Sequence, residues 1–480
     1  MINISIDVGT TNTKVTLWNE FEKLDRKIFE TPKKNNGADF NLKLLWDRVS
    51  EAIGNLSQKC DGNISKIGIA SVAESGILLD EREGKFVGPC IVWYDKRSQN
   101  IINNLSIENK DEIYSISGIP VHPHYSSSKI KWILNHYPNL QEKELVWLCI
   151  PDYIVYKLTG EIGTDQTLAS RTGCYDINKK EWSKTIKSIY GIENISFPNV
   201  YPSGTTIGKV TKTNQELLNL LNSCEVVIAG HDHMVGSRAV GLTSDELLDS
   251  TGTTEAMMLL SNEPILNDSI KESSITEGWY VDNEQCAIFT ALPSAGSVIS
   301  WINETLSLSS EDFNEIILEL YDNYIDDNLR YNNEFIIPHF NGSGSPNKRS
   351  YSKGIVYGLD LNIDKKSLVF AMFVGLTFEF VNAYKNLPDS EKITKIKVIG
   401  PAIRDDIWLQ LKADLLGLEV VALDAEEIVS LGVETTMLSK VDNNLKTKKY
   451  EPQENEIVRK LRDSYAIYTK IYDFKMRNNL

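Results

Sequence analysis

Two short Gly-Thr-Thr segments have residue types and spacing that suit one chemistry, the binding of phosphate. Gly9-Thr10-Thr11 lies near the N-terminus, and Gly252-Thr253-Thr254 lies halfway along the 480-residue chain. Glycine lets a backbone approach a phosphate closely, and consecutive amide N–H groups and threonine hydroxyls can donate to its oxygens. One such segment is more often an ordinary hairpin turn. Two of them, preceded by Asp7 and Asp249, indicate a polyphosphate gripped from both sides of a cleft.

Two aspartates stand where an apolar strand pattern ends. Asp7 precedes the first Gly-Thr-Thr segment and can hold Mg²⁺ there, through water; its alternative interpretation is an Asx turn. Asp232 follows the apolar run 226–229 and suits a general base that accepts the proton of an alcohol during phosphoryl transfer. Its alternative interpretation is a helix cap. His231 and His233 flank Asp232, but without further ligands nearby in the sequence they do not indicate a metal site.

The segments around these residues predict an α/β fold that occurs twice. Each Gly-Thr-Thr segment lies between two apolar strands, the second of which ends in an Asn-Glu turn, so the half-length repeat indicates a duplicated domain with a boundary near residues 243–246. Strands that alternate with helical patterns predict helices packed over a mixed sheet. Further strands are predicted at 66–71, 76–80, 225–229 and 395–399, a helix at 405–416 that Asp405 caps and Gly417 ends, and a buried core helix at 368–381, too short to span a bilayer.

Composition excludes several classes of partner. The formal net charge is −16 at pH 7 and no block of lysine and arginine offsets it, which argues against nucleic acid or an anionic membrane. Six scattered cysteines without a Cys-x-x-Cys pair indicate reduced thiols rather than a disulfide framework or a zinc site. The chain opens directly on a strand pattern without a secretory signal, so a cytoplasmic location is expected.

Six motifs, in the right order, resemble those of the FGGY carbohydrate kinases over most of the chain. They are the first phosphate motif (7–14), a Trp-x-Asp-x-Arg stretch (93–97), a long block (151–176), the block of the catalytic aspartate (230–232), the second phosphate motif (250–255) and the helix after the adenosine loop (408–417). A match of six ordered motifs is highly specific.

The resemblance implies two duplicated domains of the actin-like ATPase fold, which is ribonuclease H-like, with a sugar and MgATP in the cleft between them. Residues 1–244 would bind the sugar and supply the base Asp232, and residues 245–480 would bind the nucleotide. ATP would be the phosphoryl donor, Asp7 would help to position Mg²⁺, and domain closure would exclude water. The phosphates would contact Gly9, Thr10, Thr11, Asn12, Lys14, Gly252, Thr253 and Thr254, and the nucleotide would contact Gly400, Pro401, Ala402 and Arg404.

Two loops depart from the family pattern. In place of a glycine-rich adenosine loop the chain has Gly400-Pro401-Ala402-Ile403-Arg404. Its proline removes an amide donor and fixes φ, so a change in nucleotide affinity or base preference is expected. The Gly-Glu-Arg loop of xylulokinase-like members appears as Gly342-Ser343-Gly344-Ser345-Pro346, without the arginine, and Lys348 or Arg349 is its candidate substitute.

The loop matched to the family's sugar-binding loop carries Glu74. Xylulokinase-like members place a methionine-histidine pair there and glycerol kinases an arginine-glutamate pair. Glu74 is therefore expected to accept a hydrogen bond from a sugar hydroxyl and to repel an acidic substrate. Its alternative interpretation is a side chain that points away and pairs with a basic residue or solvent. Trp93 would give the sugar an apolar face and Asp95 would accept a hydroxyl. His122 or His124 could project there too; alternatively each is a surface loop residue.

These residues predict an ATP-dependent kinase for a small neutral sugar, with a five-carbon ketose such as xylulose foremost. Another polyol or a sugar acid, such as glycerol, erythritol or gluconate, is the alternative substrate. Two other classes stay open: a sugar- or nucleotide-binding protein without turnover, and an ATPase of the actin or chaperone type, against which the block 151–176 argues. The expected partners are the sugar and MgATP, and a homodimer is left open.

Overall fold

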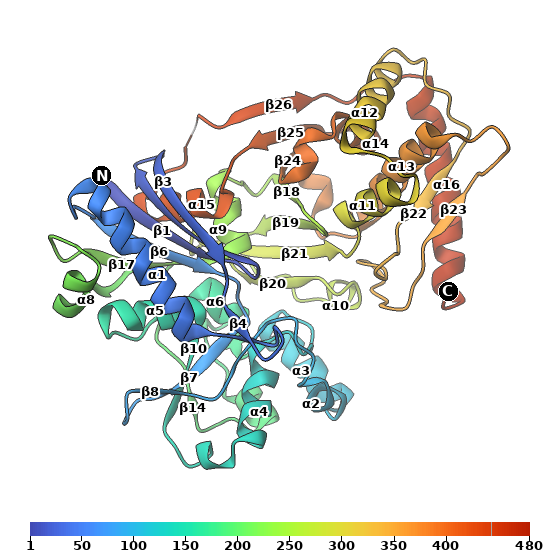
Figure 1. Cartoon of the computed structure of the whole chain (residues 1–480). Helices are drawn as coiled ribbons and strands as arrows, with labels where there is room; N and C mark the ends of the chain where they lie inside the picture. The colour runs from blue at the N-terminus through green and yellow to red at the C-terminus, as the bar shows by residue number, and fades with distance from the viewer. Residues whose placement is uncertain (443) are drawn as a thin grey trace.

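The computed structural model describes residues 1–442 and 444–480, with the side chains of all of these except residues 268 and 269. It consists of two α/β halves, each organised around a mixed β-sheet (Figure 1). The C-terminus lies at the end of the long helix α16 (Glu456–Arg477) on the outside of the second half.

A six-stranded sheet in the order β16-β17-β6-β1-β2-β3 organises the first half. Its strands are β1 (Ile2–Val8), β2 (Asn12–Asn19), β3 (Glu22–Glu30), β6 (Lys66–Ser71), β16 (Thr206–Lys209) and β17 (Glu225–His231). The first three form an antiparallel meander, β6 and β17 run parallel to β1, and β16 closes the edge antiparallel to β17. β1, β6 and β17 are buried on both faces, which is why they read as apolar runs.

The second half has a seven-stranded sheet in the order β20-β21-β19-β18-β24-β25-β26. Its strands are β18 (Glu246–Thr251), β19 (Glu255–Ser261), β20 (Thr276–Trp279), β21 (Cys286–Leu292), β24 (Lys395–Ile399), β25 (Glu419–Asp424) and β26 (Lys446–Tyr450). Here β18, β19 and β21 form the antiparallel meander, β24 and β25 run parallel to β18, and β26 is antiparallel to β25. Five neighbouring strands repeat the order and directions of the first sheet, so the predicted duplication is confirmed. The sheets differ in the added β20 and at the opposite edge, where β16 precedes its neighbour along the chain and β26 follows its own.

Two helices lie between the sheets. α9 (Asp232–Ala239) follows β17, and α15 (Ile428–Leu438) follows β25 at the corresponding place in the second half (Figure 1). Both contribute to one apolar cluster that joins residues of the two sheets. They cross closely at Gly432, where a Cβ would lie 1.9 Å from the carbonyl oxygen of Val235. The two halves are therefore joined by closely packed helices as well as by the chain connection.

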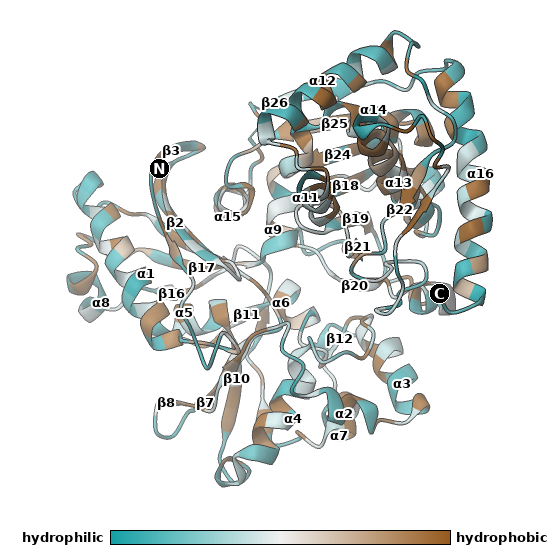
Figure 2. Ribbon diagram, turned by 45° about the vertical axis from the view of Figure 1, so that its right-hand side comes forward, coloured by the Kyte–Doolittle hydropathy of each residue, from teal (hydrophilic) through white to brown (hydrophobic). Residues whose placement is uncertain are grey.

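The other helices lie around the sheets, and α6 (Gln166–Ser170) contacts β17 of the first half and β20 of the second. In the first half these are α1 (Leu42–Ser57), α2 (Gln99–Asn103), α3 (Ile107–Ser117), α4 (Ser126–His136), α5 (Ile150–Thr159), α6 (Gln166–Ser170), α7 (Lys184–Tyr190) and α8 (Lys212–Leu217). In the second half they are α10 (Asp268–Glu272), α11 (Gly296–Thr305), α12 (Ser310–Ile325), α13 (Lys365–Lys385), α14 (Asp406–Leu416) and α16. Figure 2 shows the contrast between apolar α13 in the interior and α12 and α16, which turn hydrophilic residues outward.

Short strands complete the chain. A second sheet in the first half has the order β14-β10-β7-β8 and lies beyond the main one (Figure 1). These and the remaining strands are β4 (Lys33–Lys34), β5 (Asp39–Phe40), β7 (Gly76–Asp80), β8 (Lys85–Val87), β9 (Cys90–Ile91), β10 (Leu145–Cys149), β11 (Thr164–Asp165), β12 (Tyr175–Asp176), β13 (Glu181–Trp182), β14 (Ile195–Ser196), β15 (Val200–Tyr201), β22 (Phe335–Ile337) and β23 (Ile355–Tyr357).

Most predicted elements are confirmed, with three corrections. The strand predicted at 225–229 continues to His231, and the helix predicted from Asp405 begins one residue later, with Asp405 at its N-cap but without a capping hydrogen bond from its side chain. Helix α13 has 21 residues, so the argument that this segment is too short to span a bilayer is wrong. It is the one helix among the described residues that is long and apolar enough, and 78% of its apolar window is buried as core.

Candidate active site

The carboxyl ends of three parallel strands bring the predicted acidic residues to one edge of the first sheet. In the register of β1, β6 and β17, Val8 lies opposite Ser71, and Ser71 lies opposite His231. Asp7 is the last residue but one of β1, Glu74 follows β6 by three residues, and Asp232 follows β17 directly. This is the edge at which open α/β sheets bind ligands.

The alternation of side chains along β1 turns Asp7 toward the second half. Ile4 and Ile6 pack in the core beneath α1 and α5, whereas Asn3, on the other face, bonds Glu434 of α15. With a period of two, Asp7 shares the face of Asn3. Burial, the main cause, and the nearby carboxylates of Asp232 and Glu427 together raise the pKa of Asp7 to about 7, while Lys14 acts in the opposite direction.

Asp232 is held at the start of α9. Its Oδ1 accepts a hydrogen bond from the backbone N–H of His233 at 2.7 Å and lies 3.1 Å from Nε2 of His231. Burial is the main cause that raises the pKa of Asp232 to about 7, and Glu74 adds to it while Arg171 opposes it. A carboxylate with a pKa near neutral pH is suited to proton transfer.

A buried polar cluster fixes the strand end in front of Asp232. The backbone N–H of His231 donates to Oγ1 of Thr167 at 2.8 Å, and Thr167 donates to Asp165. Gly230, at φ 126°, lies so close that a Cβ would be 2.4 Å from the Thr167 hydroxyl oxygen. Only glycine fits there, so the block 164–170 positions the aspartate rather than contacting a ligand itself.

The first Gly-Thr-Thr turn connects β1 and β2. The amide of Gly9 donates to the carbonyl of Asn12 at 3.1 Å, and the carbonyl of Gly9 accepts from Thr31. Thr10 Oγ1 accepts from Nε1 of Trp93 at 2.8 Å, so the tryptophan touches the turn. Thr11 and Asn12 are exposed.

The second Gly-Thr-Thr turn connects β18 and β19. Gly252 N–H donates to the carbonyl of Thr254 at 2.8 Å, and the first turn of α11 donates to the carbonyls of Gly252 and Thr253. The side chains of Thr253 and Thr254 are exposed, which leaves their hydroxyls available to a ligand.

Asp249 is not the counterpart of Asp7, which corrects the sequence comparison. Asp7 stands two residues before its glycine and Asp249 stands three before its own, and a shift of one residue moves a strand side chain to the opposite face. Asp249 points to the outer face of the second sheet, where it and Glu255 pair with Lys412, all fully buried. The residue at the level of Asp7 is Ser250.

The loop after β24 adjoins the second turn. Gly400 has φ 93°, and a Cβ there would lie 2.1 Å from the carbonyl oxygen of Thr251. The N–H of Ala402 donates to Thr251 Oγ1 at 3.0 Å. Pro401 occupies the first position of a 3-10 turn, where a missing N–H has no helical partner to lose. Arg404 is exposed at the end of this turn.

Glu74 pairs with an arginine that the sequence did not single out. Nε and Nη2 of Arg171 lie 2.8 and 2.7 Å from Glu74 Oε1, both side chains are mostly buried, and Glu74 adopts φ 60°. Arg171 also lies over the ring of Tyr125 and donates to Thr276 of the second half at 3.3 Å. The charge of Glu74 is therefore compensated by a basic residue, as in the alternative interpretation of its sequence, and the contact with a sugar stays a prediction. The two residues lie 97 positions apart, so no local spacing linked them.

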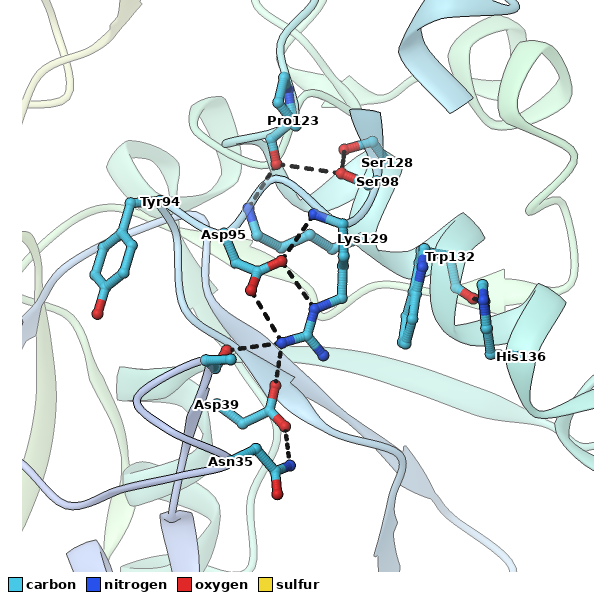
Figure 3. Close-up of polar contacts among 12 residues, drawn as sticks. Asn35, Asp39, Tyr94, Asp95, Ser98, Pro123, Ser128, Lys129, Trp132 and His136 are labelled. Carbon is cyan, nitrogen blue, oxygen red and sulfur yellow. Dashed lines mark hydrogen bonds and ion pairs between the residues drawn. The ribbon is translucent and has the colours of Figure 1, made fainter. Parts of the chain in front are cut away.

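Trp93 and Asp95 lie on one loop whose polar contacts are largely satisfied (Figure 3). Asp95 accepts hydrogen bonds from the backbone N–H, Nε and Nη2 of Arg97 at 2.8, 2.8 and 3.0 Å, and Arg97 also pairs with Asp39. Fully buried Lys129 donates to the carbonyls of Trp93, Pro123 and His124. Asp95 is therefore held mainly by Arg97.

His122 and His124 pack edge to face beside this loop and are half-buried rather than projecting from a surface. Their ring centroids lie 4.0 Å apart, and His124 lies 5.2 Å from the ring of Trp93. Burial lowers the pKa of His122 to about 4 and that of His124 to about 2, with nearby cations that include Lys348 acting in the same direction. Both rings are thus neutral at pH 7.

A cavity of about 140 Å³ joins the two halves at Asp232. Its walls come from α9, from the strands that flank the second turn and from the start of α15, and the lining residues include Asp232, His233, Ser250, Ala256, Phe289 and Ile428. The base candidate of the first half thus shares one cavity with Ser250 and Ala256, on the two strands that the second Gly-Thr-Thr turn connects.

The site residues fit a divalent cation held mainly by other ligands. Asp7 and Asp232 are buried carboxylates close enough for one to raise the pKa of the other, and the nearest cation, Lys14 Nζ, lies 3.9 Å from Asp7. Within residues 1–442 and 444–480, no group of three or more His, Cys, Asp and Glu side chains forms a metal cage. A Mg²⁺ bound through phosphate oxygens and water matches this donor set.

Comparisons with known proteins agree with this geometry. The chain is similar to glycerol kinase from Renibacterium salmoninarum (25% identity over 98% of both chains) and to glycerol kinase 2 from Saccharolobus solfataricus (26% identity over 90% of this chain and 87% of the relative). Its fold is similar to those of a ligand-bound xylulose kinase and a gluconate kinase from Lactobacillus acidophilus, each with TM-score 0.86 and 21% identity, over 99% of this chain and 98% and 99% of the respective structures.

Two family models together cover most of the sequence. Residues 2–239 match the N-terminal domain, and residues 247–435 the C-terminal domain, of the FGGY family of carbohydrate kinases. With the duplicated fold and the two phosphate turns, these matches show that the chain belongs to the FGGY family of carbohydrate kinases.

Proposed function

We propose that this carbohydrate kinase transfers the γ-phosphoryl group of MgATP to a hydroxyl of a small neutral sugar, with a five-carbon ketose such as xylulose foremost. The observation that carries the proposal is Asp232, a buried carboxylate with a pKa of about 7 that shares one cavity with Ser250 and Ala256, on the strands that flank the second Gly-Thr-Thr turn. Residues 1–244 would form the sugar domain and residues 245–480 the nucleotide domain.

Asp232 would act as the general base. As the sugar oxygen attacks the γ-phosphorus, its proton moves to the Asp232 carboxylate, the new P–O bond forms, and the bond to the β–γ bridging oxygen breaks so that ADP leaves. The hydrogen bond from the N–H of His233 keeps the Asp232 side chain directed from the start of α9.

The two turns would hold the phosphates from opposite sides. Thr10, Thr11, Asn12 and Lys14 would supply donors from the first half, and Thr253 and Thr254 would supply them from the second. The N–H groups of Gly9 and Gly252 are bonded within the turns, so these two glycines would contribute the close approach of the backbone to the phosphates. The nucleotide itself would lie against the loop of Gly400, Pro401, Ala402 and Arg404, which is bonded to the second turn through Thr251.

Asp7 would hold Mg²⁺ on its water shell beside the phosphates. When bound, the ion neutralises charge that develops on the transferred phosphoryl group. Asp7 fits this role because its carboxylate is buried next to a second carboxylate and has only Lys14 as a nearby cation.

The sugar would lie among Glu74, Arg171, Trp93 and Asp95. Glu74 offers acceptor capacity to hydroxyls, and its charge is balanced by Arg171, which supports an uncharged substrate. Asp95 is the weaker candidate for direct contact because Arg97 already donates three hydrogen bonds to it.

A sugar acid is the second candidate substrate, and the same arginine favours it. Arg171 offsets the repulsion that Glu74 alone would exert, and Lys348 lies near enough to lower the pKa of His122 and His124 on the sugar side. Two cations there can accept a carboxylate group. Glycerol and erythritol stay in the comparison as smaller neutral polyols.

Sugar-dependent release of ADP tests the proposal. Wild-type protein with MgATP is assayed on xylulose, ribulose, glycerol, erythritol and gluconate, and Asp232→Asn on the preferred substrate. The substitution should lower kcat by about 10²–10⁴-fold, the scale of general-base catalysis, with a smaller change in sugar affinity. Removing Mg²⁺ with EDTA should abolish turnover. Release of ADP that is independent of sugar would identify an ATPase, and normal kcat in Asp232→Asn would remove it as the base.

A further inference from the structure

Glu427 brings a carboxylate from the second half onto the phosphate turn of the first. It lies between β25 and α15, and its Oε2 is 2.8 Å from Nζ of Lys14, on β2. Its Oε1 pairs with Arg26, on β3. The Glu427 side chain is 11% exposed, so these are mostly buried contacts. The carboxylate of Glu427 therefore pairs with two cations of the β2–β3 hairpin, which lies about 400 residues earlier in the chain.

The side chain of Glu427 contacts Lys14 and Arg26 and does not cap its own helix, α15. Glu427 is the N-cap residue of α15, where an acidic side chain usually accepts hydrogen bonds from the first turn. Its side chain accepts none of them, and its backbone is left-handed, with φ 55°. A non-glycine residue in this conformation is held there by its surroundings, and such residues are frequent at functional sites.

Three further contacts fix the place of Glu427 by docking α15 on the first sheet. Asn3 donates to Glu434 at 2.8 Å, the hydroxyls of Thr16 and Ser430 lie 3.3 Å apart, and Lys66 donates to the carbonyl of Met437 at 3.2 Å. The helix is thus anchored along its length. Its N-cap residue, Glu427, is thereby held at a fixed place against the lysine of the sheet.

Lys14 is the residue that this arrangement controls. In the register of β1 and β2 it lies opposite Asp7, and its Nζ is 3.9 Å from the Asp7 carboxylate. Its side chain is 30% exposed, so one face of the ammonium group stays open beside the turn. Since Glu427 is shared with Arg26, the three groups keep a net charge of +1 next to the proposed phosphate site.

We propose that Glu427 is a positioning residue that orients Lys14 toward the transferred phosphoryl group. The inference rests on the proposed function, because it assigns the phosphate to the first turn. Misplacement of a group that contacts the reacting atoms can lower the rate by about 10²-fold with little loss of binding. If Glu427 only competed with phosphate for Lys14, the effect would be the opposite, because removing the Glu427 carboxylate would free Lys14 to bind phosphate.

Steady-state kinetics and calorimetry of Glu427→Gln separate these two roles. The substitution should lower kcat by about tenfold or more while the Kd of ATP, measured without turnover, changes by less than about threefold. Glu426→Gln is the matched control, since Glu426 is the neighbouring acid, is 77% exposed and pairs only with Lys23 at the rim. It should leave kcat and the Kd of ATP unchanged. Melting temperatures check that both variants are folded.

A double-mutant cycle gives a result that a merely structural role would not produce. If Glu427 acts through Lys14, Glu427→Gln should change kcat by less than about threefold in a Lys14→Met background, because coupled residues are not additive. Additive losses, an unchanged kcat, or tighter ATP binding with a higher kcat would overturn the inference. Failure of the proposed function is distinguishable, since it would show as absent sugar-dependent turnover in the wild type.

Discussion

Opposite changes to the Glu74–Arg171 pair should move substrate selection in opposite directions. Glu74→Gln leaves the Arg171 cation unpaired beside the sugar, whereas Arg171→Met leaves the Glu74 carboxylate unpaired. The ratio of kcat/KM for gluconate to kcat/KM for a neutral sugar should therefore rise in Glu74→Gln and fall in Arg171→Met. The double variant removes both charges, and its ratio should return close to that of the wild type.

The magnitude follows from the geometry of the pair. Both side chains are nearly buried, at 8% and 12% exposure, so the effective dielectric constant is closer to that of the protein than to that of water. A carboxylate about 5–6 Å from one unpaired charge then gains or loses about 1.5–3 kcal/mol at an effective dielectric constant of about 20 or somewhat higher. That corresponds to about a 10- to 150-fold change in the ratio.

The assay is coupled ADP release on gluconate and on the preferred neutral sugar, for the wild type, both single variants and the double variant. Because breaking a buried pair can destabilise a fold by about 3–5 kcal/mol, circular dichroism and melting temperature must first show that each variant is folded. If both single variants shift the ratio in the same direction, or neither shifts it by more than about threefold, the pair does not face the substrate.

Three further predictions concern stability and the nucleotide loop. Burial raises the pKa of Asp232 from 3.8 to about 7, so between these pH values the folded protein binds more protons than the unfolded chain and loses stability as the pH rises. Asp232→Asn should therefore raise the free energy of unfolding, measured in urea at pH 8, by about 2–4 kcal/mol, and this gain should vanish toward pH 4. Gly432→Ala, whose Cβ would lie 1.9 Å from a backbone oxygen of α9, should destabilise the protein by about 3 kcal/mol or more, whereas Gly236→Ala at the same crossing meets nothing within 3.6 Å and should not. Gly400→Ala should weaken ATP binding, measured by calorimetry, by about tenfold or more, because the added Cβ would lie 2.1 Å from a backbone oxygen. Pro401→Gly should change the affinity for ATP by less than about threefold. A strong effect of Pro401→Gly would instead support the altered nucleotide affinity expected from the sequence.

Much of the architecture was predictable because it rests on local patterns. Apolar strands, turn residues and a capped helix are encoded within stretches of ten to twenty residues, and the half-length repeat of Gly-Thr-Thr indicated two copies of one fold. The strand topology confirms that duplication. The comparison of Asp7 with Asp249 was wrong because a one-residue difference in spacing from the glycine, unremarkable in the sequence, decides which face of the sheet a side chain occupies.

The partner of each buried charge was not predictable. Glu74 pairs with Arg171, Asp249 pairs with Lys412 at a separation of 163 residues, and Lys14 pairs with Glu427 from the other half. Composition and spacing constrain only which groups exist and how they are arranged locally. Whether a carboxylate is free to repel a ligand depends on which cation the fold brings against it.

The sequence by itself determined the fold class, the duplicated organisation, the family resemblance and the residue types at the ends of the strands. Only the tertiary structure decided that Glu74 belongs to a balanced ion pair, that Asp249 lies on the outer face of its sheet, and that a glutamate of the second half contacts Lys14, beside the first Gly-Thr-Thr turn. The physical reason is the range of the interactions. Backbone preferences act between neighbours along the chain, whereas electrostatic pairing acts between groups that are neighbours only after the sheets and the helices between them have packed.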